Sequence, residues 1–352
     1  MKRYLLVALV GLFSPTLLAA EAAVAYIHDW KWEGQAAPML MALDEGYFAE
    51  EGLEVTMDMG KGSVHAIPKV ASGEYQFGSA DINSLIRYRD QNPDSELQAV
   101  YVVYNTPPFA VVGRRSQGVI GPGDLHGHVL GAPAKDGAFA QWASFVAASG
   151  IKADKVTVRD VGFPEREALL ADGEVDAVTG FSFSSLISLK AKGVPESDIS
   201  LMLMSDFGLE LYGNVVIVNP AFAAEHPEKV RGFVRATTRG YLKTIANPAN
   251  AIKHVMTRAE NADEEVELSR LIMAIGHHIV TPEVRDHGIG TLQWDRLERS
   301  IEQIGQSYAY TQQPSASDIF DDTFLPGRES RELLKPEIIN PDDVMTAEEL
   351  AQ

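Results

Sequence analysis

Two copies of one seven-residue pattern decide the fold of this chain: ASGEYQF at residues 71–77 and ADGEVDA at residues 171–177. Each copy joins the end of an expected helix to an apolar strand through a turn that contains glycine. Upstream lie two further similar segments in the same order, EVTMDMG at residues 54–60 and KVTVRDVG at residues 155–162. One such match arises by chance in α/β proteins, whereas two in the same order indicate a pair of similar lobes.

The segments around the first copy alternate between strand and helix patterns. A short apolar run predicts a strand over residues 24–28, and helical spacing of apolar residues predicts a helix over residues 40–48 that stops before Gly52. Residues 53–59 alternate apolar and polar side chains, as a half-buried strand does. A glycine-rich turn then leads into a helix over residues 64–71. This order predicts a parallel sheet covered by helices.

The whole chain is therefore expected to form an α/β fold of two lobes, each with a mostly parallel sheet flanked by helices, joined by a double-crossover hinge. Such a hinge lets two lobes close on a ligand in the cleft between them. The expected division is residues 1–22 as a signal peptide, residues 23–112 and 204–315 as a discontinuous first lobe, residues 113–203 as an inserted second lobe, and residues 316–352 as an acidic tail.

The first 22 residues have the order of a secretory signal. Two basic residues precede an apolar run over residues 4–13, and small residues follow, with a cut expected after Ala20 or Ala22. A membrane anchor is the alternative, but a serine-proline pair interrupts a run that would barely span a bilayer. A lipid anchor needs a cysteine at the cut, and the chain has none. We expect a mature protein that is periplasmic, not membrane-anchored and monomeric.

Composition excludes several other classes. The 352 residues include 49 acidic and 30 basic side chains, with a formal net charge of −19 and no cysteine. This acidity argues against a nucleic-acid partner, which requires clustered cations. Without cysteine there is no thiolate metal site. The pairs His126 and His128, and His277 and His278, lack a third ligand at a helpful spacing, so we expect neither a metal site nor a cofactor.

Five loops lie where an expected strand leads into a helix: residues 28–35, 60–63, 78–81, 132–138 and 180–184. Ligands of open α/β sheets bind outside the carboxyl ends of strands, where such loops converge. The candidate ligand-binding residues are Asp29, Trp30, Trp32, Glu33, Lys61, Ser63, Ser79, Asp81, Lys135, Asp136, Phe181 and Ser182.

The first loop holds two of the four tryptophans of the chain, Trp30 and Trp32. Aromatic faces stack on planar rings, so we expect at least one of them to form a wall for a planar ligand. The alternative is that both tryptophans pack against their own lobe and hold the loop in place there. Structural alternatives also stay open for Asp81 and Ser182, which can simply cap the helices that follow them.

Three segments resemble the NMT1/THI5-like family: Asp29-Trp30 at the end of the first strand, MALDEGYFAEEGLEV at residues 41–55, and GSAD at residues 78–81. The likeness extends from about residue 23 to residue 326. That family comprises periplasmic solute-binding proteins of ABC importers for thiamine-precursor pyrimidines, with relatives for taurine, alkanesulfonates and nitrate. The resemblance implies a type II periplasmic-binding-protein fold, a small-molecule ligand, and the transmembrane subunits of an ABC permease as partner.

The same family includes pyrimidine synthases of thiamine biosynthesis, which are enzymes. Those carry a lysine four residues before a histidine just after the third strand, together with a cysteine cluster. Here the corresponding residues 78–84 contain neither, and the chain has no cysteine. The resemblance therefore implies a binding protein and not an enzyme. The remaining alternative of another class is an enzyme that uses Lys61 and His65.

Two kinds of ligand stay open on this resemblance. A pyrimidine would stack on Trp30 or Trp32, with Asp29, Glu33 or Asp81 accepting hydrogen bonds from an exocyclic amine. A sulfonate or another anion would need amide groups at helix starts and a cation, for which the candidates are Lys31, Lys61 and Lys135. The paired tryptophans and the nearby acids favour the planar heterocycle.

Overall fold

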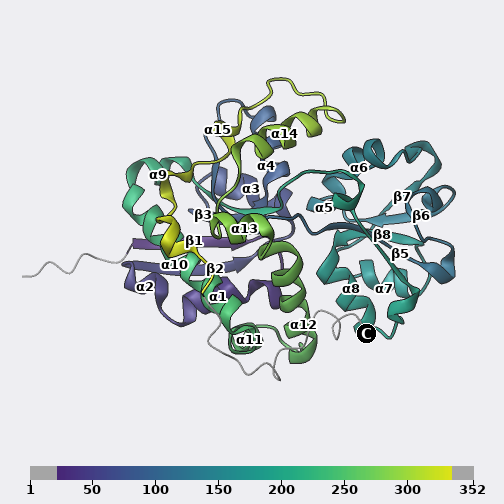
Figure 1. Ribbon diagram of the computed structural model, residues 1–352, viewed down its shortest axis with the longest axis horizontal. Coiled ribbons are helices and arrows are strands. Elements are labelled where there is room, and N and C mark those ends of the chain that lie inside the picture. Colours follow the sequence, from purple (N-terminus) through teal and green to yellow (C-terminus); the bar gives the residue numbers. More distant parts are fainter. Residues whose placement is uncertain (1–21, 335–352) are drawn as a thin grey trace, which may run out of the picture.

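The computed structural model describes residues 22–334, which form two lobes side by side (Figure 1). The predicted signal peptide thus lies outside the described residues except for Ala22. The first lobe contains a five-stranded sheet in the order β2-β1-β3-β10-β4. Its strands are β1 (Ala22–His28), β2 (Leu53–Met59), β3 (Phe77–Asp81), β4 (Gln98–Val102) and β10 (Asn214–Val218). β1 pairs in parallel with β2 and β3, whereas β10 runs antiparallel between β3 and β4.

The second lobe repeats this arrangement in the order β7-β6-β8-β5-β9. Its strands are β5 (Phe109–Arg114), β6 (Val129–Ala132), β7 (Thr157–Asp160), β8 (Ala177–Phe181) and β9 (Ile199–Leu203). β6 is parallel to β7 and β8, and β5 runs antiparallel between β8 and β9. In each sheet one strand therefore runs antiparallel to the other four. This confirms the prediction of two mostly parallel sheets.

The repeated heptapeptide occupies the same place in both lobes. Helices α3 (Ser63–Ala71) and α7 (Arg166–Ala171) end at the first alanine of each copy, and β3 and β8 begin at the last residue. Gly73 and Gly173 have φ of +81° and +77°, the left-handed conformation that favours glycine.

Even a side-chain contact recurs in the two copies. The backbone N–H of Ala25 donates to Gln76 Oε1 at 2.8 Å, and that of Val129 donates to Asp176 Oδ2 at 2.7 Å. Both contacts tie the residue before β3 or β8 to the neighbouring strand, which makes the two lobes structural equivalents at this turn.

Helices cover the faces of both sheets. Around the first sheet lie α1 (Ala37–Asp44), α2 (Tyr47–Glu50), α3, α4 (Ile82–Gln91), α9 (Pro220–Glu225), α10 (Pro227–Ala246), α11 (Pro248–Met256), α12 (Glu264–Ala274), α13 (Pro282–His287), α14 (Trp294–Gly305) and α15 (Ala316–Ile319). Around the second lie α5 (Gly137–Ala140), α6 (Trp142–Ser149), α7 and α8 (Ser182–Ala191). The helix expected over residues 40–48 is two helices, because Gly46 between them adopts a φ of +76°. No helix within residues 22–334 is long and apolar enough to cross a membrane.

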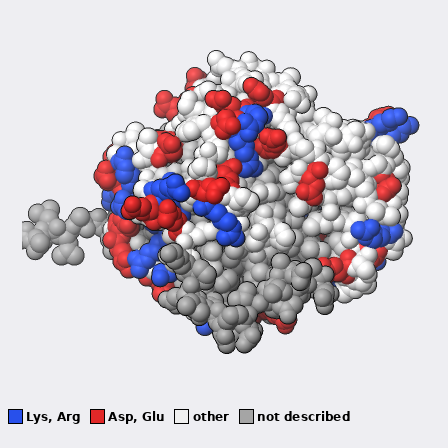
Figure 2. Space-filling model, in the orientation of Figure 1, with Lys and Arg blue, Asp and Glu red and all other residues white. Residues whose placement is uncertain are grey.

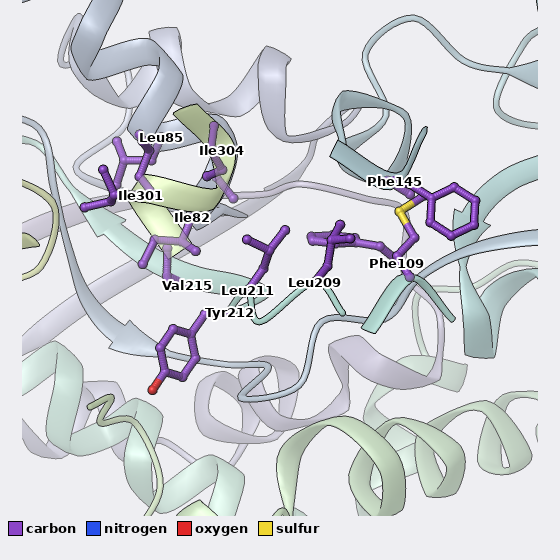
Figure 3. Packing of buried hydrophobic residues seen from close by; sticks show 14 of the residues in the cluster. Ile82, Leu85, Phe109, Phe145, Leu209, Leu211, Tyr212, Val215, Ile301 and Ile304 are labelled. Atoms are coloured by element: carbon purple, nitrogen blue, oxygen red, sulfur yellow. The ribbon is translucent and has the colours of Figure 1, made fainter. Parts of the chain in front are cut away.

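Two chain segments cross between the lobes, residues 103–108 and 204–213, and they run together. The N–H of Gly213 donates to the carbonyl of Tyr104 at 2.9 Å. A Cβ on Gly213 would lie 2.8 Å from Cβ of Tyr104, so only glycine permits this approach. Apolar side chains of the second crossing, Leu209 and Leu211, pack between those of the two lobes (Figure 3). The second crossing thus joins the apolar packing of the two lobes into one cluster.

The described part of the predicted tail packs onto the first lobe. Phe320 forms a parallel bridge with Ala99 beside β4, and its side chain is buried together with Ile319. On the face shown in Figure 2, most basic side chains lie beside acidic ones. One ion pair of the first lobe joins Arg235 to Glu51 at 2.6 Å. The charges of this face are therefore mixed.

Candidate functional site

A cavity lies between the two lobes. The first lobe contributes Asp29, Trp30, Gly62 and Ser63, and the second contributes Asp136, Gly137, Phe163, Arg166, Phe181 and Ser184. These residues belong to the loops and helix starts that follow β1, β2, β6, β7 and β8, or to the end of β8 itself. The cavity is therefore outside the carboxyl ends of the parallel strands, where the fold class places ligands.

Asp29 forms the polar wall on the first lobe. Its carboxylate is buried and accepts hydrogen bonds from Ser79 Oγ at 2.8 Å, Ser63 Oγ at 3.3 Å and Asn214 Nδ2 at 2.6 Å. Among residues 22–334, no lysine or arginine forms an ion pair with it. A buried carboxylate held only by neutral donors retains a strong demand for further donors. This wall therefore suits a ligand with N–H or O–H groups.

Asp136 forms the corresponding wall on the second lobe. It accepts from Thr179 Oγ1 at 3.3 Å and caps α5 by accepting from the N–H of Ala138 at 3.3 Å. Burial raises the pKa of Asp136, and the guanidinium of Arg166, 3.5 Å away, opposes that rise. Arg166 also pairs with Glu167 at 2.6 Å. The positive charge of Arg166 is thus shared between two acids before any ligand binds.

Aromatic rings from both lobes meet at the cavity. The ring centroids of Trp30 and Phe163 lie 4.5 Å apart, edge to face at 61°, and they come from opposite lobes. Phe181 lines the same space. Trp32 lies elsewhere: it stacks on His28 at 5.4 Å and packs against the cluster formed by α1, α11 and α12. Only Trp30 of the two tryptophans therefore faces the cavity.

An inner chamber shares three lining residues with this cavity, namely Asp29, Trp30 and Phe181. The other residues of the chamber are Tyr26, His28, Gln35, Ser79, Val103, Tyr104, Asn214 and Tyr241. Burial raises the pKa values of Tyr104 and Tyr241 well above their usual range, so both phenols stay protonated. Burial also lowers the pKa of His28, which favours the neutral imidazole.

The structure brings together seven of the twelve residues predicted from the sequence. Six of these line the cavity or the chamber: Asp29, Trp30, Ser63, Ser79, Asp136 and Phe181. The seventh, Glu33, lines an outer part of the cleft with Trp30 and Arg166. The residues that line none of these spaces are Trp32, Lys61, Asp81, Lys135 and Ser182.

These five have other surroundings. Of the two helix-capping alternatives, that of Asp81 holds, whereas α8 has Phe181 at its N-cap and no capping side chain. Asp81 caps α4 by accepting from the N–H groups of Asn83 and Ser84. Ser182 Oγ lies 2.7 Å from His278 Nε2. Lys61 and Lys135 have exposed side chains.

The lobes touch on both sides of the cavity. On one side, Gln141 Nε2 of the second lobe donates to Asp81 Oδ2 at 3.0 Å. On the other, Ser184 Oγ donates to Glu33 Oε2 at 3.1 Å. A Cβ on Gly62 would lie 2.4 Å from the carbonyl oxygen of Lys135 across the cleft. The described conformation is therefore a closed one.

Three further residues line the cavity that were not predicted from the sequence: Phe163, Arg166 and Ser184. Phe163 and Arg166 follow β7, the counterpart of β2 in the repeat. The loop after β2 is one of the five candidate loops, so the aligned repeat is a signal that also points to the loop after β7. Ser184 stands in a predicted loop but looks like an ordinary helix residue in the sequence.

The chain is similar to known proteins in sequence and in fold. A family model described as NMT1/THI5 like matches residues 33–251, more than half of the chain. The chain is 29% identical over 240 residues to the riboflavin-binding protein RibY of Chloroflexus aurantiacus, covering 67% of this chain and 65% of that protein. It is 29% identical over 245 residues to a formylaminopyrimidine-binding protein of Halalkalibacterium halodurans, covering 68% of this chain and 72% of that protein. The chain thus spans about two thirds of the length of these relatives.

A more distant relative is an enzyme by name. The chain is 25% identical over 240 residues to a 4-amino-5-hydroxymethyl-2-methylpyrimidine phosphate synthase of Aspergillus parasiticus. The match covers 65% of this chain and 69% of that protein. Among solved structures, the alkanesulfonate-binding protein SsuA from Xanthomonas axonopodis pv. citri has a TM-score of 0.66 at 15% identity. That likeness covers 85% of this chain and 96% of the other, and it shows the periplasmic-binding-protein fold.

Proposed function

This chain belongs to the NMT1/THI5-like family, and on that premise we propose that it is the periplasmic substrate-binding protein of an ABC importer. Its two lobes close on a small planar heterocycle such as a thiamine-precursor pyrimidine. The relatives named for binding formylaminopyrimidine and riboflavin support a nitrogen heterocycle as the ligand class.

The lining of the cavity is the observation that carries this proposal. Trp30 and Phe163 offer aromatic faces to a flat ring, and aromatic stacking is tolerant of ring type. Asp29 and Asp136 offer carboxylate oxygens to ring or amine N–H groups from opposite sides. Apolar walls with a few convergent polar groups are typical of small-molecule sites.

A sulfonate or another small anion is the second candidate, because relatives in fold bind sulfonates. The charges of the cavity disfavour it. Arg166 is the one cation among the residues that line the cavity, and it already contacts Asp136 and Glu167. An anion here would meet two buried carboxylates and a cation that is already paired, whereas neither Lys61 nor Lys135 lines the space.

We also propose that the protein releases its ligand unchanged. An enzyme using Lys61 and His65 would need both side chains at the ligand. Neither lines the cavity, and Lys61 meets His65 only through its backbone N–H, 3.3 Å from Nδ1. A pyrimidine-synthase-like reaction is therefore the less favoured alternative.

The biological setting follows from the same proposal. The leader at residues 1–22 directs export and is removed, the mature protein stays free in the periplasm as a monomer, and the ligand passes to the transmembrane subunits of the permease. The predicted lobes, residues 23–112 with 204–315 and residues 113–203, are the bodies that move relative to one another.

Calorimetric titration with formylaminopyrimidine, riboflavin and taurine tests this function. We expect saturable binding of at least one of the two heterocycles, no binding of taurine, and recovery of the heterocycle unaltered by mass spectrometry. Binding of taurine alone would establish the anion alternative, and a chemically converted heterocycle would establish an enzyme.

A further inference from the structure

One arginine of α14 binds both chain segments that cross between the lobes. Arg296 Nη2 donates to the carbonyl of Asn105 in the first crossing at 2.9 Å and to the carbonyl of Leu211 in the second at 2.7 Å. Its guanidinium also lies 4.0 Å from the ring centroid of Tyr212. A guanidinium carries its N–H donors in a rigid planar fork, so one side chain can hold two backbone segments in a fixed relation.

A carboxylate of α13 holds this arginine in place. Glu283 Oε2 accepts from Arg296 Nη1 at 2.9 Å. The other oxygen, Oε1, accepts from Asn105 Nδ2 at 2.8 Å and from the hydroxyl of Tyr212 at 2.7 Å. The side chains of Arg296 and Glu283 are only 19% and 17% exposed, so solvent screens this pair less than a surface pair. The ion pair and both crossings thus form one hydrogen-bonded unit.

The same face of α14 also binds the backbone of the second crossing. Ser300 Oγ donates to the carbonyl of Glu210 at 2.8 Å. Gln303 Oε1 accepts from the N–H of Glu210 at 2.9 Å, and Gln303 Nε2 donates to the carbonyl of Gly208 at 2.6 Å. Arg296, Ser300 and Gln303 are four and three residues apart, which places them on one side of the helix. The second crossing is therefore attached to the first lobe from Gly208 onward.

Gly208 itself is where the second crossing changes lobes. Its N–H donates to the carbonyl of Ser205 in the turn after β9 at 3.1 Å, whereas its carbonyl accepts from Gln303 of α14. The ring of the preceding residue, Phe207, packs on Phe145 of α6 with centroids 5.5 Å apart. The chain thus passes from the second lobe to the first within the backbone torsions of one glycine.

Pro107 is the corresponding place in the first crossing. Thr106, just before it, is bound to His278 of the first lobe through its N–H at 3.2 Å and its carbonyl at 3.1 Å. The carbonyl of Pro108, just after it, accepts from the N–H of Ser182 of the second lobe at 2.7 Å. Pro107 has no N–H with which to bind either lobe.

We propose that Arg296 is a positioning residue of the hinge: it clamps both crossings onto α14, so that lobe movement bends the chain only at Pro107 and Gly208. Hinges are a few residues that absorb a change in backbone torsions. Gly208 suits this role because its φ of +91° is open to glycine and nothing lies within 4 Å of its Cβ position. The inference goes beyond the proposed function, because it concerns the movement of the free protein and not the ligand.

Distances between spin labels on the two lobes test the clamp in the ligand-free protein. The chain has no cysteine, so Glu225→Cys and Asp154→Cys at exposed positions take one label on each lobe. We expect Arg296→Met to broaden the distribution of distances, because both crossings are released from α14. Arg258→Met is the matched control.

Arg258 donates to Asp44 at 2.8 Å inside the first lobe and contacts neither crossing. Its removal should leave the distribution as it is in the labelled parent protein. Both arginine variants should lower the melting temperature. The width of the distribution therefore distinguishes a hinge clamp from a contact that only stabilises the fold.

A second pair of variants tests the bending point and does not depend on the folding of Arg296→Met. Gly208 and Gly150 both lie in the left-handed region, with φ and ψ of +91° and +15°, and of +71° and +16°. Nothing lies within 4 Å of either Cβ position. Alanine is strained in this region, and at Gly208 a rotation of the lobes relieves the strain, so Gly208→Ala should shift the mean distance between the labels. Gly150 lies inside the second lobe, so Gly150→Ala should leave that mean unchanged.

Two results would overturn the clamp. One is an Arg296→Met distribution as narrow as that of the labelled parent protein, and the other is the same mean distance in Gly208→Ala and Gly150→Ala. If Arg296→Met does not fold, the comparison of the two glycine variants decides alone. No ligand enters these measurements, so their outcome is independent of the calorimetric test of the proposed function.

Discussion

The indole N–H of Trp30 donates to Glu33 Oε2 at 3.2 Å, and the same oxygen accepts a hydrogen bond from Ser184 of the other lobe at 3.1 Å. Burial opposes ionisation of Glu33, but the nearby cations of Arg270 and Lys31 lower its pKa and keep it charged. Arg270 in turn donates to Ser188 of the second lobe at 3.0 Å.

Ser184 and Ser188 are one helical turn apart on α8, so Glu33 and Arg270 both form hydrogen bonds with the same face of that helix. The orientation of the stacking wall is thereby linked to closure of the cleft.

Removing the indole of Trp30 should weaken ligand binding. Trp30→Ala takes away one stacking face, which we expect to cost about 1–3 kcal/mol of binding free energy, by analogy with base–aromatic stacking. Trp32→Ala is the control, because Trp32 packs on His28 within its own lobe. We expect its affinity to stay near that of the wild type while its melting temperature falls. A larger loss in Trp32→Ala, measured by calorimetry with the heterocycle that binds, would show that the wall is misplaced.

A methyl group at Gly62 should obstruct closure. Gly62 has a φ of +92°, and its Cβ would lie 2.4 Å from the carbonyl oxygen of Lys135 in the other lobe. We expect Gly62→Ala to weaken ligand binding by about tenfold or more, the equivalent of ~1.4 kcal/mol lost from closure. Small-angle scattering should show a larger radius of gyration with ligand present.

Gly46→Ala separates closure from backbone strain. Gly46 also has a positive φ, +76°, but nothing lies within 4 Å of its Cβ position. Gly46 lies in the left-handed helical region (φ +76°, ψ +16°), where alanine costs less than at the φ of +92° and ψ of +161° of Gly62, and this variant should bind ligand normally. Equal losses of affinity in the two variants would mean that closure does not depend on the contact at Gly62.

Gln141 should hold the closed state from the opposite edge of the cleft. Its Nε2 donates to Asp81 at 3.0 Å, and its Oε1 accepts from Arg87 at 2.9 Å. Gln141→Leu leaves both partners short of a hydrogen bond, so the closed state should lose about 1–3 kcal/mol. Stopped-flow measurements should show faster ligand dissociation and nearly unchanged association.

The control is Ser200→Ala, which removes a buried hydrogen bond of 2.6 Å to the carbonyl of Val119 inside the second lobe. It should lower the melting temperature without changing dissociation. Unaltered dissociation in Gln141→Leu would assign that contact to stability alone.

His278 should make the fold sensitive to acid. Burial is the main reason that its pKa falls to about 3, and its ring bridges Ser182 and the carbonyl of Thr106 at 2.7 and 3.1 Å. The unfolded chain takes up a proton near pH 6.5, so stability is lost as the pH falls from about 6.5 toward 3.

We expect this group to cost about 2 kcal/mol of unfolding free energy between pH 7 and pH 5. His278→Gln should remove that part of the pH dependence, as measured by urea unfolding at both pH values. An identical slope in the variant would place the acid sensitivity in other groups.

Much of the fold could be predicted because it depends on local patterns. The strand over residues 53–59 alternates in burial as its sequence does at its start, and the repeat fixed the helix-to-strand turns at Gly73 and Gly173. The break near Gly46 could not be predicted because the helical spacing of apolar residues continues across it. The left-handed conformation of this one glycine interrupts the helix without changing that spacing.

The candidate site was harder to predict because it depends on contacts across the cleft. Asp29 and Trp30 lie at the end of a predicted strand, where position alone indicates a ligand site. The choice between Trp30 and Trp32 is decided by which ring meets Phe163 of the other lobe. Arg166 was missed because its role is set by Asp136, thirty residues away and buried beside it.

A crystal structure of the protein with 4-aminopyrimidine tests the central claim most directly. The proposed function predicts the ring between the lobes, stacked against Trp30, with its amine within hydrogen-bond distance of Asp29 or Asp136. A ring bound outside the cleft, or an open cleft with no contact to Trp30, would contradict it.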